Sequence, residues 1–190
     1  MNKHILAGAL LSAGLMLSNA AQAQVQDLTT WTATGGVSAS GSSATMISYG
    51  TSTSSFGGTN GSLLSKTFNL VAGDKISFDW LFKAGDYLPY NDSALFSLND
   101  TKFKLSDVAT VGNYGSSGLQ SFSYTATNTG AATLSFLVSN YSDTNQNSTL
   151  QVSNVNIAAV PEPETYALMA TGLLGLLFSR KKKVAVQAAA

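Results

Sequence analysis

Between residues 24 and 159 the chain has no cysteine, histidine, arginine or glutamate. Without cysteine, disulfide bonds and thiolate metal sites are excluded. The absence of both histidine and cysteine rules out a Ser-His-Asp or Cys-His catalytic arrangement, and a zinc site would lack its usual nitrogen and sulfur ligands. Basic residues are too few for the positive patch that nucleic acids need, so we expect no nucleic-acid partner.

What this segment does contain is mostly Ser, Thr, Asn and Gly, together with eight Asp and five Lys. These charges give it a net charge of about −3. Its 136 residues are enough for one domain with a hydrophobic core. That core must hold the fold, and a bound hard cation is the further aid that the composition allows.

The beginning of the chain has the pattern of a secretory signal peptide. Lys3 and His4 form a basic start, an apolar run extends from Ile5 to Leu17, and the small-residue stretch 21–23 resembles a cleavage site. A membrane anchor is the alternative, but roughly 13 apolar residues are too few to span a bilayer. We therefore expect export, with residues 1–23 removed and a single domain at 24–159.

Apolar and polar residues alternate along several stretches of that domain. In "KISFDWLF" the residues Ile76, Phe78, Trp80 and Phe82 fall on one face, which is typical of a half-buried strand. Similar stretches, separated by Gly, Asn and Asp turns, predict an all-β fold: a single antiparallel β-sandwich, jelly-roll-like. The further strands are expected at 93–99, 120–126, 132–139 and 148–157, with weaker ones at 28–34, 44–50 and 63–70.

Two details refine this prediction. The alternation in "STLQVSNVNI" slips by one residue at Ser153-Asn154, which predicts a β-bulge. The Ser/Gly-rich stretch 32–62 is interpreted as edge strands and loops, with disorder as the alternative. We expect the core to include Phe78, Trp80, Phe96, Phe122, Leu134, Phe136, Val152 and Val155.

The end of the chain has a three-part pattern. The segment "VPEPET" is followed by a 12-residue apolar run, Ala167 to Phe178, and then by four basic residues. As a helix this run rises about 18 Å, less than the roughly 30 Å hydrocarbon core of a bilayer. We therefore expect a short hydrophobic helix that holds a precursor in the inner membrane only transiently, with its basic end in the cytoplasm. The basic cluster consists of Arg180, Lys181, Lys182 and Lys183.

Residues 160–183 together resemble the PEP-CTERM sorting signal, with Pro161, Glu162 and Pro163 as its motif and 184–190 as a short tail. The resemblance implies an exosortase, a membrane transpeptidase-like protease that processes the chain near the motif. It also implies a Gram-negative bacterium that makes exopolysaccharide and biofilm. The expected location is a membrane-anchored precursor and then the cell surface or the extracellular space. A plain tail anchor is the alternative.

The loop "AGDYLPYND", between two expected strands, is the most informative part of the domain. Its oxygen-bearing residues Asp86, Asn91 and Asp92 suit a hard cation such as Ca²⁺, although their spacing is not that of an EF-hand. Turn and cap roles are the alternative. The same stretch resembles a segment that recurs in ectodomains with the PEP-CTERM signal, which supports a jelly-roll-like fold and implies no activity.

Aromatic residues in this loop suggest a ligand. Tyr87 and Tyr90 could stack on sugar rings, or pack back over the sheet edge. The function that we expect is a non-enzymatic surface or matrix protein associated with extracellular polysaccharide. A carbohydrate-binding module of the same layer is the alternative. An Asp-dependent glycoside hydrolase using Asp79, Asp86 or Asp92 is a more distant one.

Overall fold

The computed structural model describes residues 23–49, 58–160 and 167–175. The predicted signal peptide up to residue 22, the motif at 161–163 and the basic cluster at 180–183 lie outside the described residues. Residues Ala21–Val160 form one compact unit, and the C-terminal helix belongs to a second unit.

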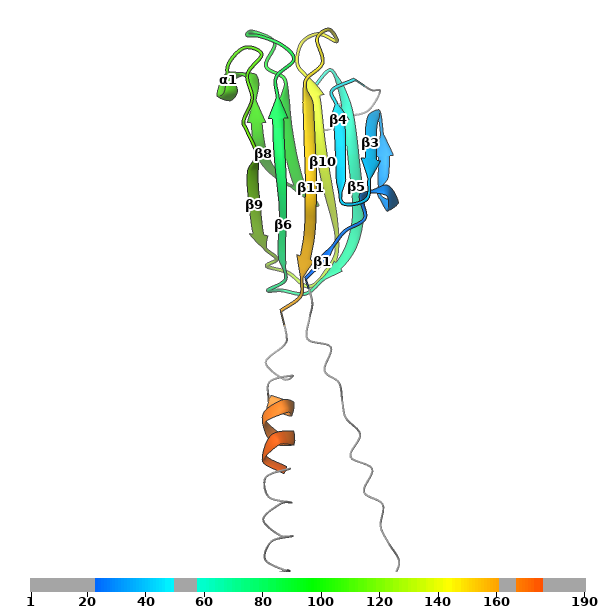
Figure 1. The fold of residues 1–190 in the computed structure, drawn as a ribbon, viewed down its shortest axis with the longest axis vertical. Coiled ribbons are helices and arrows are strands. Elements are labelled where there is room, and N and C mark those ends of the chain that lie inside the picture. The colour runs from blue at the N-terminus through cyan, green and yellow to red at the C-terminus, as the bar shows by residue number, and fades with distance from the viewer. Residues whose placement is uncertain (1–22, 50–57, 161–166, 176–190) are drawn as a thin grey trace, which may run out of the picture. The chain divides into compact units, whose positions relative to one another are not determined.

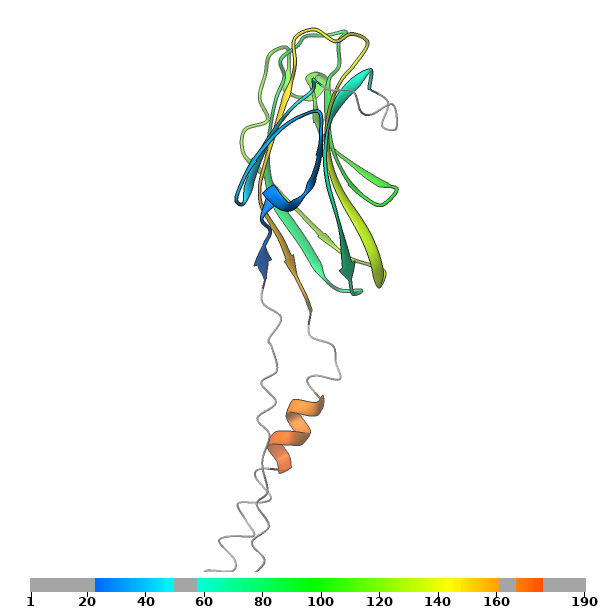
Figure 2. The ribbon, with the colours of Figure 1, turned by 90° about the vertical axis from the view of Figure 1, so that its right-hand side faces the viewer.

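The compact unit is a β-sandwich of two antiparallel sheets, as predicted. One sheet has the strand order β3-β4-β11-β6-β9, with β1 paired to β11, and the other has the order β2-β5-β10-β7-β8. Figure 2 shows the two layers edge on. The strands are β1 (Gln24–Val25), β2 (Thr32–Thr34), β3 (Gly36–Ser40), β4 (Ser43–Ile47), β5 (Asn60–Leu70), β6 (Lys75–Lys83), β7 (Ser93–Leu98), β8 (Thr101–Asp107), β9 (Gln120–Thr125), β10 (Gly130–Asn140) and β11 (Thr149–Ala158). Two short helices accompany them, η1 (Leu28–Thr30) and α1 (Val108–Val111).

Alternation of side chains explains why the strands form. In β6, Ile76, Phe78 and Phe82 are each at most 2% exposed, whereas Ser77, Asp79 and Leu81, which alternate with the core-facing residues, are only partly buried. The predicted bulge in β11 is confirmed, because the pairing of β11 with β6 shifts register between Ser153 and Asn156. Asn154 within it has a φ of 54°, the left-handed conformation that Asn tolerates better than most residues.

A cluster of phenylalanine rings joins the two sheets at the centre. The Phe78 ring of β6 lies 4.9 Å from Phe96 of β7 and 4.8 Å from Phe136 of β10, between ring centroids. Phe122 stacks on Phe78 at 4.9 Å. All the residues predicted for the core contribute to it, with Trp80 and Phe122 partly buried and the others buried.

The loops that connect the strands lie at two opposite ends of the sandwich. The loops β6–β7, β8–β9 and β10–β11 gather at one end, which we call the loop end (Figure 1). Strand β11 starts there at Thr149 and reaches the opposite end, the tail end, at Ala158. At about 3.3 Å per residue, its 10 residues separate the two ends by roughly 30 Å.

The described part of the C-terminal segment, residues 167–175, is helical. All its side chains are exposed, including Leu168, Met169, Leu173 and Leu174. Among the described residues, no helix combines the length and the apolarity that crossing a membrane requires.

Candidate functional site

Three loops lock together at the loop end. The Tyr114 amide donates to the Asp86 carbonyl at 2.9 Å, and the Ala84 amide donates to the Gly115 carbonyl at 2.9 Å. On the other side, the Gly85 amide donates to Ser148 Oγ at 2.9 Å. The β6–β7 loop is therefore held between the β8–β9 and β10–β11 loops.

Gly85 permits the closest of these approaches. A Cβ atom at this position would lie 2.0 Å from the backbone oxygen of Asn147, a distance that real Cβ atoms do not show. Only glycine lets the β10–β11 loop come this near. The sequence pattern "AGD" indicated a turn, but it did not indicate this contact.

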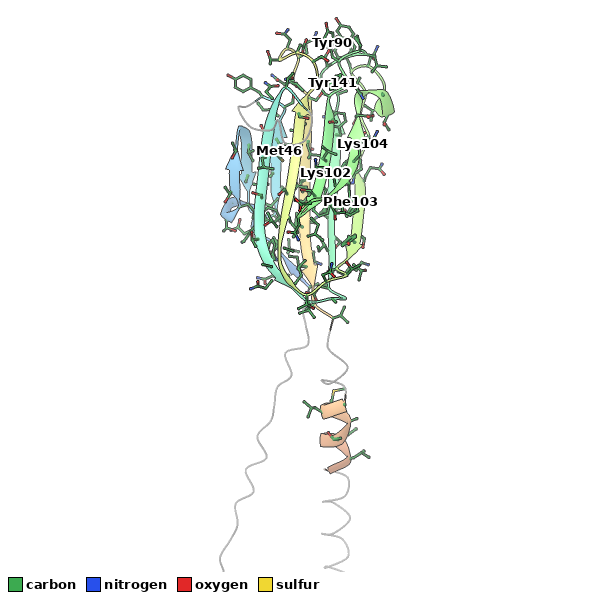
Figure 3. The ribbon with its side chains drawn as sticks, turned by 180° about the vertical axis from the view of Figure 1, so that it is seen from behind. Met46, Tyr90, Lys102, Phe103, Lys104 and Tyr141 are labelled. Atoms are coloured by element: carbon green, nitrogen blue, oxygen red, sulfur yellow. The ribbon has the colours of Figure 1, made fainter. Side chains whose placement is uncertain are left out.

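Tyrosine rings gather on the outside of the β6–β7 loop. The Tyr87 ring meets Tyr90 edge-on at 5.5 Å and Tyr114 at 5.9 Å, between ring centroids. Tyr87 is 38% exposed and Tyr114 is 58% exposed. We call Tyr87, Tyr90 and Tyr114 the tyrosine cluster; Figure 3 shows Tyr90 together with Tyr141 at the loop end.

The structure thus adds Tyr114 to the two tyrosines predicted as a stacking surface. Tyr114 comes from the β8–β9 loop, and its φ of 55° places it in the left-handed region. The sequence shows a tyrosine between Asn113 and Gly115 but cannot show which loop it meets. The amide hydrogen bond from Tyr114 to Asp86 determines that meeting.

Two carboxyl groups are buried beneath this surface. Asp86 is 1% exposed and Asp92 is fully buried. Asp92 Oδ1 accepts from the Tyr141 amide at 3.0 Å and its Oδ2 accepts from Ser148 Oγ at 2.7 Å. Burial raises the pKa of Asp92; the hydrogen bonds from Ser148 and Tyr141 oppose this rise, and the Asp86 and Asp143 carboxylates add to it.

Asn91, the third residue of the predicted cation site, binds elsewhere. Its Oδ1 accepts from the Ala109 amide at 2.8 Å, and its Nδ2 donates to Asp107 Oδ2 at 3.3 Å. Both partners belong to the beginning of α1, where Asp107 is the N-cap residue. In this structure the Asn91 amide ties the β6–β7 loop to α1.

Asp79 lies apart from the buried pair, on the outer face of β6. Its carboxylate accepts from Ser121 Oγ at 2.6 Å and from Asn154 Nδ2 at 2.9 Å. These hydrogen bonds, the one from Asn154 first, hold its pKa below the usual value. The three aspartates considered for glycoside hydrolysis therefore do not share one site. Within the described ranges, no group of three or more His, Cys, Asp or Glu side chains is arranged to hold a metal ion.

Comparison with known proteins identifies the C-terminal segment. Residues 159–182 match the family model of the PEP-CTERM protein-sorting motif. The chain therefore carries this sorting motif, directly after the last strand of the sandwich. No protein with curated annotation matches the sequence significantly.

Solved structures with a similar arrangement of strands share little sequence with this chain. TmCBM61 in complex with β-1,4-galactotriose has a TM-score of 0.42 at 10% identity, over 70% of this chain and 91% of that one. The K3 cleaved adhesin domain of Lys-gingipain from Porphyromonas gingivalis has a TM-score of 0.37 at 13% identity, over 62% and 74%. The N-terminal cellulose-binding domain of Cellulomonas fimi β-1,4-glucanase C has a TM-score of 0.37 at 14% identity, over 70% of this chain and 90% of that one. Likeness at this level says nothing about what the present chain binds.

Proposed function

We propose that this chain is an exported, non-enzymatic surface or matrix protein that an exosortase processes at its PEP-CTERM motif. The observation that carries the proposal is the match at residues 159–182, which begins where β11 ends. The exposed apolar helix that follows supports it, because such a surface needs an apolar environment. The product would join the extracellular polysaccharide layer.

The geometry of the sandwich supports a display role. The sorting segment leaves from the tail end, while the tyrosine cluster lies at the loop end, roughly 30 Å away along β11. The point at which the sorting segment is attached therefore lies at the opposite end of the sandwich from the tyrosine cluster. This arrangement suits a surface protein whose loops make the contacts.

The chemistry of the sandwich supports a non-enzymatic role. Glycoside hydrolysis needs two carboxyl groups that flank a substrate. Asp86 and Asp92 are at most 1% exposed, and Asp79 lies on another face. Between residues 24 and 159 there is also no histidine, cysteine or glutamate, the side chains that most often act as general acid or base beside aspartate.

The sorting step can be tested by changing the motif. We expect the double variant Glu162→Ala and Pro163→Ala to accumulate as full-length precursor in the membrane fraction of a host that has an exosortase. The unaltered chain should accumulate in the same way when the exosortase gene is deleted. Asp100→Ala, in the exposed β7–β8 turn, is the control and should mature normally. Normal maturation of the double variant would refute exosortase processing at this motif.

A second function, carbohydrate binding, is favoured by the tyrosine cluster. Exposed, mutually packed aromatic rings offer flat apolar faces at a small entropic cost, and such residues often dominate binding energies. Tyr87 and Tyr114 are exposed, touch each other and face away from the core. We propose that this surface stacks on sugar rings of the polysaccharide produced by the same cell.

Affinity electrophoresis in gels that contain this polysaccharide tests the second function. We expect Tyr87→Ala and Tyr114→Ala each to weaken the affinity derived from the retardation about 5- to 30-fold, since losing a central aromatic contact costs on the order of 1 to 2 kcal/mol. Tyr49→Ala is the matched control, because Tyr49 is 62% exposed and lies outside the cluster. Equal retardation of all three variants would refute the assignment.

A further inference from the structure

The two buried aspartates at the loop end have no basic partner in their hydrogen bonds. The donors to Asp92 are the Tyr141 amide and the Ser148 hydroxyl, which are both neutral. Asp86 Oδ1 accepts from the Tyr87 amide at 2.8 Å, which is neutral as well. The charges that act on Asp92 are those of the Asp86 and Asp143 carboxylates, which disfavour its ionised form.

Asp86 also has an unused oxygen. Its Oδ2 is buried and has no hydrogen-bond partner, although the residue is only 1% exposed. Buried carboxylate oxygens are almost always paired, because an unpaired charge in the interior is strongly unfavourable. This oxygen is therefore available to a ligand that the protein chain itself does not supply.

Asp86 and Asp92 are close enough for the charge of one to act on the other, and neighbouring atoms link their surroundings. Ser148 Oγ accepts from the Gly85 amide and donates to Asp92 Oδ2, so it bridges the residue before Asp86 to the second carboxylate. The Asn147 backbone oxygen is pressed against Gly85 from the same loop. The surroundings are therefore rich in oxygen and contain no nitrogen or sulfur ligand of the kind that transition metals prefer.

We propose that Asp86 and Asp92 bind a hard divalent cation, Ca²⁺, at the loop end. Two carboxylates balance its charge, and backbone oxygens together with water complete the six to eight oxygen ligands that Ca²⁺ takes. The Asn91 amide, engaged with α1, stands outside this ligand set. The inference does not depend on sugar binding or on sorting.

Such a cation would also position the tyrosine cluster. Tyr87 directly follows Asp86, and the Tyr114 amide donates to the Asp86 carbonyl. Holding the Asp86 carboxylate therefore holds the backbone from which both rings project. Removing the cation would take away one restraint on the β6–β7 loop that carries Tyr87, beside the backbone hydrogen bonds that remain.

Thermal unfolding of the purified full chain in 10 mM CaCl₂ and in EDTA tests the proposal. Extracellular modules often bind Ca²⁺ with a Kd of about 10⁻⁴ to 10⁻³ M, for which we expect a Tm increase of roughly 5 to 10 °C. Asp86→Asn keeps the shape of the side chain and removes its charge, so it should abolish the increase. Asp79→Asn is the matched control: Asp79 also accepts two hydrogen bonds, but on the outer face of β6, and it should keep the full increase.

If Asp86→Asn does not fold, a direct measurement of cation binding to the unaltered chain still tests the proposal. Tyr87 and Tyr114 are close enough to the site to sensitise the luminescence of bound Tb³⁺, which Ca²⁺ should then displace. The proposal is overturned if the unaltered chain shows neither a Tm increase nor displaceable Tb³⁺ luminescence. It is equally overturned if Asp86→Asn folds and keeps the full increase, and the buried pair would then share a proton instead.

Discussion

Replacing Phe96 by alanine should remove a large part of the stability of the sandwich. Phe96 is fully buried, and its ring lies 4.9 Å from Phe78, 5.1 Å from Phe122 and 5.4 Å from Phe136, between centroids. It therefore belongs to the cluster that joins the two sheets. Truncating a buried Phe costs about 3 to 5 kcal/mol, and these three ring contacts and a fourth, to Phe103, are lost with it, so we expect a loss of about 4 kcal/mol.

Urea unfolding followed by tryptophan fluorescence measures this loss. A domain of this size has a total stability of about 5 to 15 kcal/mol, so the variant should unfold at a much lower urea concentration, and its Tm should fall by roughly 10 to 15 °C. Leu119→Ala is the control, because Leu119 is 69% exposed and its truncation should change stability by less than about 0.5 kcal/mol. A loss below about 1 kcal/mol for Phe96→Ala would refute a core built on this ring cluster.

Two further predictions concern the loops. Gly85→Ala should lower the free energy of unfolding in urea by about 1 to 3 kcal/mol, because its Cβ would lie 2.0 Å from the Asn147 backbone oxygen. A loss no larger than that of Asp100→Ala would contradict the close approach. For Asp107, burial opposes ionisation, but hydrogen bonds from Lys104 and Thr110 outweigh it and lower its pKa to about 2. Because this pKa is lowered from 3.8, the stabilisation is complete above pH 3.8 and is lost as the pH falls towards 2. Asp107→Asn should therefore remove about 1 to 2 kcal/mol of the stability difference between pH 5 and pH 2, and an unchanged difference would refute this assignment.

The strands that could be predicted are those whose two faces differ strongly. In β6 and the first part of β10, large apolar residues alternate with Ser, Thr or charged residues, and burial follows this alternation from Lys75 to Phe78 and from Ala132 to Phe136. The last residues of β10, from Leu137 to Asn140, are all buried. Strand β8 shows the pattern too, since Phe103 and Leu105 alternate with lysines, but it was not among the predicted strands. Strand β3 has only Val37 and Ala39 on its inner face, so its pairing with β4, and not its own sequence, makes it a strand.

The burial of the candidate cation site could not be predicted from the sequence, because the segments that cover it are far away along the chain. Asp86 and Asp92 could be recognised as oxygen-bearing loop residues, but their burial depends on segments far away. The donors to Asp92, Ser148 and Tyr141, are 56 and 49 positions from it. A loop with the same sequence and no such partners would expose both aspartates as ordinary turn residues. Asn91 takes the capping role that was the alternative to a cation site, because its Oδ1 accepts from the Ala109 amide at the start of α1, 18 positions along the chain.

The position of the buried carboxylates suggests why they persist in a chain that otherwise contains so few charges. A pair of buried aspartates whose hydrogen-bond donors are all neutral destabilises the folded state, since burial disfavours their charged forms. At the tail end, the Asp74 carboxylate has its own donors, the amides of Val71 and Val160. Only the loop end combines a buried carboxylate oxygen without a partner with exposed aromatic rings, among the residues that the structure describes. A bound cation would offset this local cost and further restrain the β6–β7 loop that carries Tyr87 and Tyr90.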